Sequence, residues 1–226
     1  MTRGMVGAAA LVLAAGAASA QVPPTPAELA RYTGLHGAAA RNDALGIARL
    51  LVAGADPEAR DGNGRTALHV AAFASHAAAL RALVEGGARA NALDAQRYDI
   101  VTIAAVRDDI AMVRLALALG ASPRNVTSPY DGTALIAAAH LGHAEVVREL
   151  VKAGAPLDHV NNIGWTAMLE AVILGDGGSR HTSTLRALLE AGADLRITDR
   201  GGVSPLAHAR ARGYVEMAAI LERAGR

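Results

Sequence analysis

One sequence unit recurs along this chain with a period close to 33 residues. Each unit begins at a hydroxyl or carboxylate residue, and these positions are Thr33, Thr66, Asp99, Thr133, Thr166 and Ser204. The successive spacings are 33, 33, 34, 33 and 38 residues. A Gly-Ala pair keeps the same period, with its glycine at 54, 87, 120, 154 and 192. Two landmarks that share one period predict about six stacked supersecondary units, each packed only against its neighbours.

Within a unit, the residues predict two short antiparallel helices and a hairpin-like finger. In the second unit we expect helices over 67–73 and 77–84, with Thr66 capping the first through its hydroxyl. Ala71-Ala72 allows neighbouring helices to approach closely, and Gly87 ends the second helix because glycine adopts a left-handed conformation without a Cβ penalty. The expected fold class is therefore an all-α solenoid of helix-turn-helix units with β-hairpin-like fingers.

The clearest unit, with Gly64-Arg-Thr-Ala-Leu-His-Val-Ala-Ala72 and then Leu83-Val-Glu-Gly-Gly-Ala88, resembles the ankyrin repeat. The resemblance covers roughly residue 28 to the C-terminus and implies a structural role for His69, bridging the Thr66 hydroxyl and backbone. Proline follows the Thr position only at Ser204-Pro205, and the unit that begins at Asp99 lacks the Leu-His pair. We expect a proline-rich lead and N-terminal cap over 21–31 and the repeat domain over 32–226.

The first twenty residues have a different pattern. Arg3 is followed by an apolar run over 5–17 and by Ala18-Ser-Ala20, which is typical of a signal peptide with a cleavage site after residue 20. The run is short for a bilayer-spanning helix, which needs about 20 residues, so an uncleaved anchor is the weaker alternative. We therefore expect a chain that is exported to a bacterial periplasm or secreted, without stable membrane insertion after cleavage.

Composition narrows the function classes. Without residues 1–20 the basic and acidic residues are equal in number, which disfavours nucleic-acid binding through phosphate neutralisation. No cysteine is present, so thiolate metal sites and a cysteine nucleophile are excluded. Of the eight histidines, His36, His69, His76 and His143 fit structural positions of the repeat, and the others lack the neighbouring ligands that a zinc site needs. We expect no cofactor, no metal and no catalytic residue, and a monomer by default, so the chain is interpreted as a non-enzymatic protein.

The resemblance implies that another protein is bound through the fingers and the ends of the first helices, which line a concave surface. Five of the six aromatic residues fall on the positions expected to face that surface, and such surfaces concentrate aromatic and arginine anchors. The alternative is that these aromatics only pack between fingers. The residues expected to bind the partner are Tyr32, Arg65, Phe73, Tyr98, Arg107, Tyr130, Trp165, Ile173, Asp176, Arg180 and His181.

The fifth unit contains an insertion, Gly175-Asp-Gly-Gly-Ser-Arg-His181, which predicts a mobile or tightly turned loop. This stretch is similar to a variant unit of exported bacterial ankyrin proteins, some of which are associated with catalases and oxidative-stress defence. We expect Glu170 to hydrogen-bond the loop backbone and fix its shape. Partner binding is the favoured role of the loop. The alternatives are small-anion or metal binding, an enzyme-supporting role, and a passive spacer in the envelope.

Overall fold

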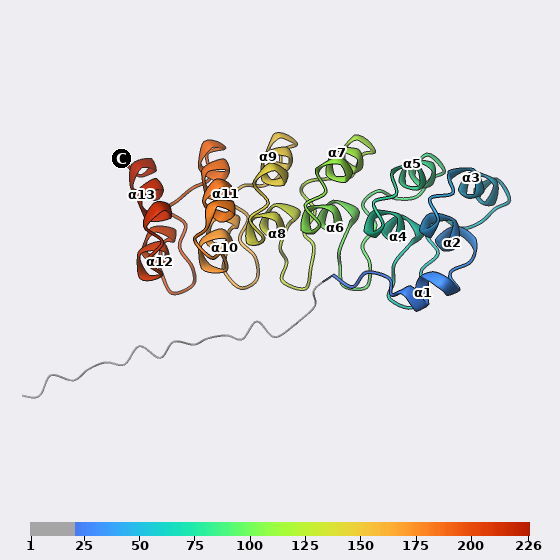
Figure 1. Cartoon of the computed structure of the whole chain (residues 1–226), viewed down its shortest axis with the longest axis horizontal. Coiled ribbons are helices and arrows are strands. Elements are labelled where there is room, and N and C mark those ends of the chain that lie inside the picture. The colour runs from blue at the N-terminus through green and yellow to red at the C-terminus, as the bar shows by residue number, and fades with distance from the viewer. Residues whose placement is uncertain (1–20) are drawn as a thin grey trace, which may run out of the picture.

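The computed structural model describes residues 21–226, and within them the chain forms a row of helix pairs preceded by one short helix (Figure 1). The expected signal peptide lies in residues 1–20, outside the described part. The first helix of each pair, here called the inner helix, is α2 (Gly34–Ala40), α4 (Ala67–Phe73), α6 (Ile100–Val106), α8 (Ala134–His140), α10 (Ala167–Ile173) or α12 (Pro205–Ala211). The outer helices are α3 (Ala44–Val52), α5 (Ala77–Glu85), α7 (Ile110–Ala118), α9 (Ala144–Lys152), α11 (Ser179–Glu190) and α13 (Val215–Ala224).

The inner helices form one layer and the outer helices a second, and the loops between units project below the inner layer (Figure 1). Neighbouring inner helices contact each other along the row, as α2 with α4 and α8 with α10. Between residues 21 and 226 the only β-type pairing is an isolated antiparallel bridge between Thr127 and Gly132. The prediction of an all-α solenoid with hairpin-like fingers is therefore confirmed.

Each inner helix begins directly after the residue that starts the sequence unit. The side chains of Asp99, Thr133, Thr166 and Ser204 accept the backbone N–H three residues further on, as expected of N-caps. At Thr66 the cap is shared with His69, whose Nδ1 lies 3.1 Å from the Thr66 backbone nitrogen. In the first five units, the glycine that follows the outer helix ends it in a left-handed conformation, with φ between +88° and +98°.

Alanine pairs set the distance between layers. Ala71 and Ala72 are fully buried, as are Ala104 with Ala105 and Ala138 with Ala139. Leucine, isoleucine and valine from the outer helices, such as Leu83 and Leu150, fill the space between neighbouring units. Because the apolar cluster continues from the first unit to the last, stability depends on contact between neighbours. None of the helices in residues 21–226 combines the length and apolar character needed to span a bilayer.

The short helix α1 (Pro26–Arg31) precedes the array. Thr25 caps it in a reciprocal capping box, because the Thr25 hydroxyl accepts the Glu28 N–H and the Glu28 carboxylate accepts the Thr25 N–H. Residues 21–25 are extended and run at the level of the finger tips in the view of Figure 1. We refer to residues 21–31 as the lead.

Candidate functional site: the finger surface

Every finger uses the same hydrogen-bonding device, and each is numbered by the unit whose inner helix follows it. Five residues before the N-cap stands an oxygen-bearing side chain that accepts two backbone N–H groups of its own finger. In the second finger, Asp61 Oδ1 accepts from Asn63 and Arg65, both at 2.9 Å. The equivalent acceptors in the third to sixth fingers are Asp94, Ser128, Asn161 and Asp199.

This device fixes the two residues that each finger presents beside the inner helices. One is the pre-cap residue, directly before the N-cap, and the other lies two positions earlier. We call these ten positions of the second to sixth fingers the finger surface. Its pre-cap members are Arg65, Tyr98, Gly132, Trp165 and Val203, and its earlier members are Asn63, Gln96, Tyr130, Ile163 and Gly201. Because repeat positions are equivalent, side chains at one position follow one line along the array.

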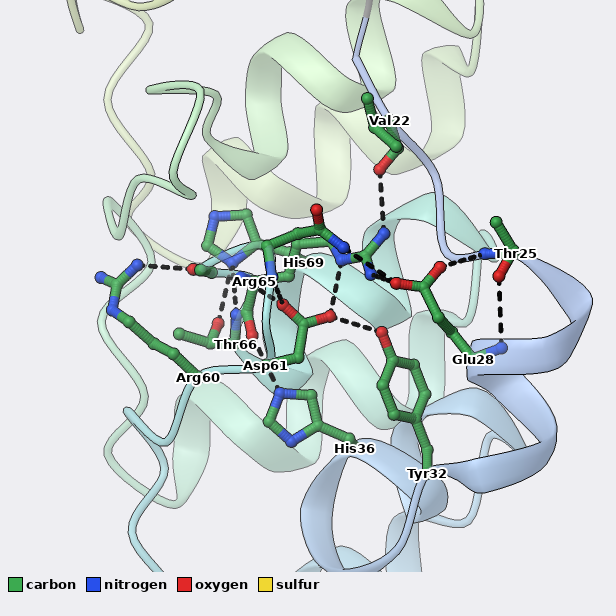
Figure 2. Close-up of polar contacts among 12 residues, drawn as sticks. Val22, Thr25, Glu28, Tyr32, His36, Arg60, Asp61, Arg65, Thr66 and His69 are labelled. Atoms are coloured by element: carbon green, nitrogen blue, oxygen red, sulfur yellow. Dashed lines mark hydrogen bonds and ion pairs between the residues drawn. The ribbon is translucent and has the colours of Figure 1, made fainter.

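The lead covers the second finger by closing around Arg65 (Figure 2). Arg65 is 0% exposed, and its guanidinium donates to Glu28 Oε1 at 2.6 Å, to Asp61 Oδ2 at 2.7 Å and to the Val22 carbonyl at 3.0 Å. The Tyr32 hydroxyl also donates to Asp61 Oδ2. One arginine thus joins the extended lead, helix α1 and the second finger.

The groups that enclose Arg65 have shifted pKa values. Burial by itself raises the pKa of Asp61, but hydrogen bonds from the Tyr32 hydroxyl and from Arg65 outweigh it, and the pKa lies below its ordinary value. The pKa of Glu28 is lowered mainly by its hydrogen bonds with Thr25, with Arg65 contributing less. The pKa of Tyr32 is raised, chiefly by burial and then by its hydrogen bond to Asp61. Both carboxylates are therefore ionised opposite the guanidinium near neutral pH.

Three of the residues expected to face a partner are buried, so their predicted exposure is wrong. Arg65 is enclosed by the lead as described. Phe73 is 7% exposed because it ends α4 with its ring packed into the apolar cluster. Tyr98 is also 7% exposed and belongs to the same cluster, and its burial raises the pKa of its hydroxyl.

Other predicted residues remain accessible, and they concentrate beyond the third finger. Tyr130 is 39% exposed, while Trp165 and Ile173 are partly exposed. Arg107, the C-cap of α6, is exposed and has no carboxylate partner among residues 21–226. Tyr32 is half-buried, because its hydroxyl is engaged by Asp61 and its ring lies 5.4 Å from that of His36. The aromatic and large apolar members of the finger surface that are accessible thus lie in the fourth to sixth units, while the polar Asn63 of the second finger is exposed as well.

The insertion in the fifth unit is half loop and half helix. Ser179, Arg180 and His181 form the first turn of α11, which has 12 residues where α9 has nine. Asp176 Oδ1 accepts the Gly178 N–H at 2.9 Å and also contacts His181 Nδ1 at 2.9 Å. These contacts define a tightly turned loop, one of the two conformations that its sequence predicts.

Neighbouring units hold this loop on both sides. His181 Nε2 lies 3.0 Å from the carbonyl of His140 in the fourth unit, and the Tyr214 hydroxyl of the sixth unit donates to the Gly175 carbonyl at 2.8 Å. Gly177 has φ +73°, and a Cβ there would lie 2.4 Å from the Tyr214 ring. The insertion therefore links the fourth, fifth and sixth units.

Glu170 does not contact the loop backbone, so that prediction is wrong. It is 4% exposed, and its carboxylate accepts from Asn161 Nδ2 and from His140 Nδ1, each at 3.0 Å. Since Asn161 holds the fifth finger, Glu170 supports the finger that carries Trp165. His140 thus links the support of Trp165 to the insertion, because its side chain contacts Glu170 and its carbonyl contacts His181.

Arg180 points away from Glu170 towards the third unit, where its Nη2 lies 3.6 Å from Asp108 Oδ2. Both residues line a cavity of about 400 Å³. Its lining is polar and of mixed charge, and consists of Asp108, Ile110, Gly142, His143, Ala144, Glu145, Arg148, Ser179, Arg180 and Ser183. No group of three or more potential metal ligands occurs within residues 21–226.

Comparison with known proteins identifies the family. A model described as ankyrin repeats in three copies matches residues 35–126 and 101–199. The chain belongs to the ankyrin-repeat family. The ankyrin repeat protein YahD of Escherichia coli (strain K12) is 38% identical over 102 residues, which cover 45% of this chain and 51% of YahD. The chain thus spans about half the length of that relative.

Solved ankyrin structures resemble this array along most of its length. An ankyrin repeat domain from Acinetobacter baumannii AYE has a TM-score of 0.79 and 43% identity, covering 84% of this chain and 97% of that domain. The ankyrin repeat domain of Bcl-3, a member of the IkappaB protein family, has a TM-score of 0.76 and 27% identity over 86% of this chain and 87% of its own. Ankyrin repeats are generally protein-interaction modules without catalytic activity, so a protein partner is the general expectation for this array.

Sequence reasoning missed most of the residues that support the finger surface. Glu28 and Asp61 hold Arg65, Asn161 supports Trp165, and Tyr214 packs on the insertion. Glu170 was singled out, but for a contact with the insertion rather than for its bond to Asn161. A signal for the finger device was present, because an Asp, Asn or Ser stands five residues before each N-cap from Thr66 to Ser204. No comparable pattern marks Glu28, whose role depends on how the lead folds back.

Proposed function

We propose that this chain is a non-catalytic protein-interaction module of the bacterial envelope, which binds another protein through the finger surface of its fourth to sixth repeats. The observation that carries the proposal is the change in exposure along one repeat position. Arg65 and Tyr98 are buried, whereas Trp165 is partly exposed and Val203 is 36% exposed. A partner can therefore reach the later part of this line.

The chemistry of the accessible part suits protein binding. Tyr130 and Trp165 are large side chains with few rotatable bonds, and Asn161 Oδ1 holds the Trp165 backbone N–H at 2.9 Å. Rigid aromatic anchors lose little entropy on binding, and they account for much of the energy of typical protein interfaces. Arg107 adds a cation without a carboxylate partner in the described chain. Asp176, Arg180 and His181 lie on the insertion, and we assign them a peripheral part in the same interface.

Affinity capture from an envelope fraction tests the proposal. The purified chain is the bait, and the variant carries both Tyr130→Ala and Trp165→Ala. We expect the variant to lose the captured partner, because truncating a buried aromatic anchor typically costs about 2 kcal/mol or more. The matched control carries Leu45→Ala and Val52→Ala, which remove two exposed apolar side chains from the opposite, outer layer. Retention of the same partner by the aromatic double variant would refute the proposal.

The location in the envelope rests on the sequence pattern of residues 1–20. Cell fractionation and N-terminal sequencing test it, with the mature chain expected to begin at Gln21. A purified chain that begins at Met1 would contradict cleavage. We also propose a link to oxidative-stress defence, for which a deletion strain should be more sensitive to peroxide. An unchanged sensitivity would count against that link.

The cavity beside α11 supports a second candidate function, small-anion binding. Two guanidinium groups, Arg148 and Arg180, and the hydroxyls of Ser179 and Ser183 line it. Asp108 and Glu145 line it too and would repel an anion, so we rank this function below partner binding. Isothermal titration with inorganic phosphate tests it, with Arg180→Ala as the variant. No heat of binding with the unmodified chain would remove this candidate.

A further inference from the structure

The lead shows what kind of chain the finger surface accepts. Residues 22–26 read Val-Pro-Pro-Thr-Pro, and residues 21–25 are extended. At the second finger the pre-cap side chain, Arg65, donates to the Val22 carbonyl at 3.0 Å. It also donates to the Glu28 carboxylate, which accepts from Asn63 Nδ2 at 2.8 Å as well. Arg65 therefore holds a carbonyl of the extended, proline-containing part of the lead, and Arg65 and Asn63 together hold the Glu28 carboxylate on the helix that follows it.

The fifth finger offers an equivalent donor to a chain from outside. Trp165 occupies the pre-cap position of Arg65, and its indole N–H has no hydrogen-bond partner within residues 21–226. An indole N–H can donate only to an acceptor such as a carbonyl oxygen. Ile163 and Val203, each 36% exposed, flank it with apolar surface. Grooves lined with aromatic side chains are a recurring way to bind proline-rich segments, whose extended conformation is largely preformed.

The charge of this region favours an acidic segment. Arg107 has no carboxylate partner in the described part of the chain. Arg200 donates to the Asn162 carbonyl and Arg212 contacts His208 Nδ1, so neither of these arginines has its charge neutralised by a carboxylate. By contrast, the carboxylates nearby are engaged, since Asp199 binds His208 and Asp131 binds Arg97. A ligand carboxylate would thus meet unpaired guanidinium groups, as Glu28 meets Arg65.

We infer that the partner presents an extended, proline-containing segment that carries a carboxylate, and that this segment lies along the fourth to sixth fingers with a backbone carbonyl on the Trp165 indole. The inference rests on the proposed function and specifies the chemistry of the partner. The segment continues the line that the lead occupies at the second finger. A folded surface without such a segment is the competing occupant.

Trp165 makes a direct test possible because it is the only tryptophan. The probe is a synthetic peptide with the sequence of residues 21–31, which contains no aromatic residue. Titration into the full chain should change the Trp165 fluorescence saturably. A peptide with all three prolines replaced by alanine, and another with Glu28→Gln, should each bind at least about tenfold more weakly. Absence of saturable binding, or equal binding of the three peptides, would overturn the inference.

Anisotropy of a labelled peptide then locates the site. Trp165→Ala should weaken binding about 30-fold or more, the loss typical of an aromatic anchor. A peptide that instead displaced the chain's own lead at Arg65 would bind Trp165→Ala as tightly as it binds the unmodified chain, and that result would also overturn the inference. If the peptide does not bind but the aromatic double variant still loses its captured partner, the inference fails and the proposed function stands. If the aromatic double variant keeps its captured partner, the proposed function fails whatever the peptide does.

Discussion

The guanidinium of Arg65 and the carboxylate of Glu28 lie 2.6 Å apart across 37 residues of sequence, and this ion pair closes the N-terminal end of the array. Glu28 belongs to α1 and Arg65 to the second finger, so the contact spans the whole first unit. A terminal repeat has a neighbour on one side only and needs another way to cover its open side. Here the lead provides that cover, and in doing so it occupies part of the finger surface.

Replacing Arg65 should therefore release the lead. Arg65→Ala leaves the Glu28 and Asp61 carboxylates without their cation, and removing one partner of a buried pair costs about 3 kcal/mol at the lower end of the usual range. The lower end applies because the Glu28 side chain is 23% exposed. We expect faster amide exchange over residues 25–33 and a lower midpoint in urea.

An exposed pair provides the control for this prediction. Arg114 donates to Glu149 at 2.6 Å on the outer layer, where the Arg114 side chain is 63% exposed. Arg114→Ala should destabilise the chain far less than Arg65→Ala, because solvent screens such exposed pairs. Equal losses in the two variants would show that burial of Arg65 contributes nothing to stability.

The frame of the fold was predictable because it repeats. Thr66, Thr133 and Thr166 cap helices where the period places them, and His69 bridges Thr66 to the backbone of the next finger. Each of these roles is set by neighbours at fixed sequence distance. A repeated pattern therefore specifies them without knowledge of the rest of the chain.

Exposure at the candidate site was not predictable, because it depends on parts of the chain that do not repeat. Arg65 and Trp165 stand at equivalent positions, yet the lead covers only the first. The length of the unit revealed the insertion, but not that its second half forms the first turn of α11. That turn is held where Asp176 and the His140 carbonyl contact His181. Such contacts between distant, unrepeated residues leave no period in the sequence.

His69 should make stability fall on mild acidification. Burial lowers the pKa of His69 below its ordinary value, and Nδ1 accepts the Thr66 N–H while Nε2 lies 3.1 Å from the Ala92 and Tyr98 carbonyls. The unfolded chain takes up this proton near pH 6.5 whereas the folded chain does not. The free energy of unfolding should thus drop by up to about 1.4 kcal/mol per pH unit below that value.

Urea unfolding at several pH values between about 7.5 and 5.5 checks this, with His69→Gln as the comparison. The variant is less stable at neutral pH but should lose less on acidification, since it has no proton to bind. The difference between the two slopes isolates His69 from the other histidines. Parallel slopes for the two chains would contradict the prediction.

Replacing Gly177 should destabilise the protein more than replacing Gly202, because only Gly177 lies against another side chain. Both have a left-handed backbone, with φ +73° and +74°, and alanine in this conformation costs about 1–2 kcal/mol. A Cβ at Gly202 meets nothing within 4 Å, but at Gly177 it would clash with the Tyr214 ring. We expect Gly177→Ala to destabilise the last two units by about 1–3 kcal/mol more than Gly202→Ala, as overpacking does. Amide exchange in α12 and α13 measures the difference, and equal effects would mean that the ring moves aside freely.

Aspartate should destabilise the fifth finger at the position five residues before the N-cap, although three other fingers have aspartate there. Asp61, Asp94 and Asp199 accept the finger N–H groups where the fifth finger has Asn161. The residue nine positions after this acceptor explains why the fifth finger has an asparagine. In the sixth finger it is His208, whose Nε2 lies 2.7 Å from Asp199 Oδ2, but in the fifth it is Glu170, which needs the amide donor of Asn161.

Asn161→Asp would place two carboxylates in contact at a site where both residues are almost fully buried. Even at an effective dielectric constant near 20 the repulsion is about 4 kcal/mol for charges about 4 Å apart, unless one carboxylate takes up a proton. We expect a loss of that order at neutral pH which diminishes on acidification, with altered Trp165 fluorescence. Adding Glu170→Gln returns an amide donor opposite the new carboxylate and should recover most of the loss. A double variant no more stable than Asn161→Asp would show that Glu170 does not dictate the asparagine.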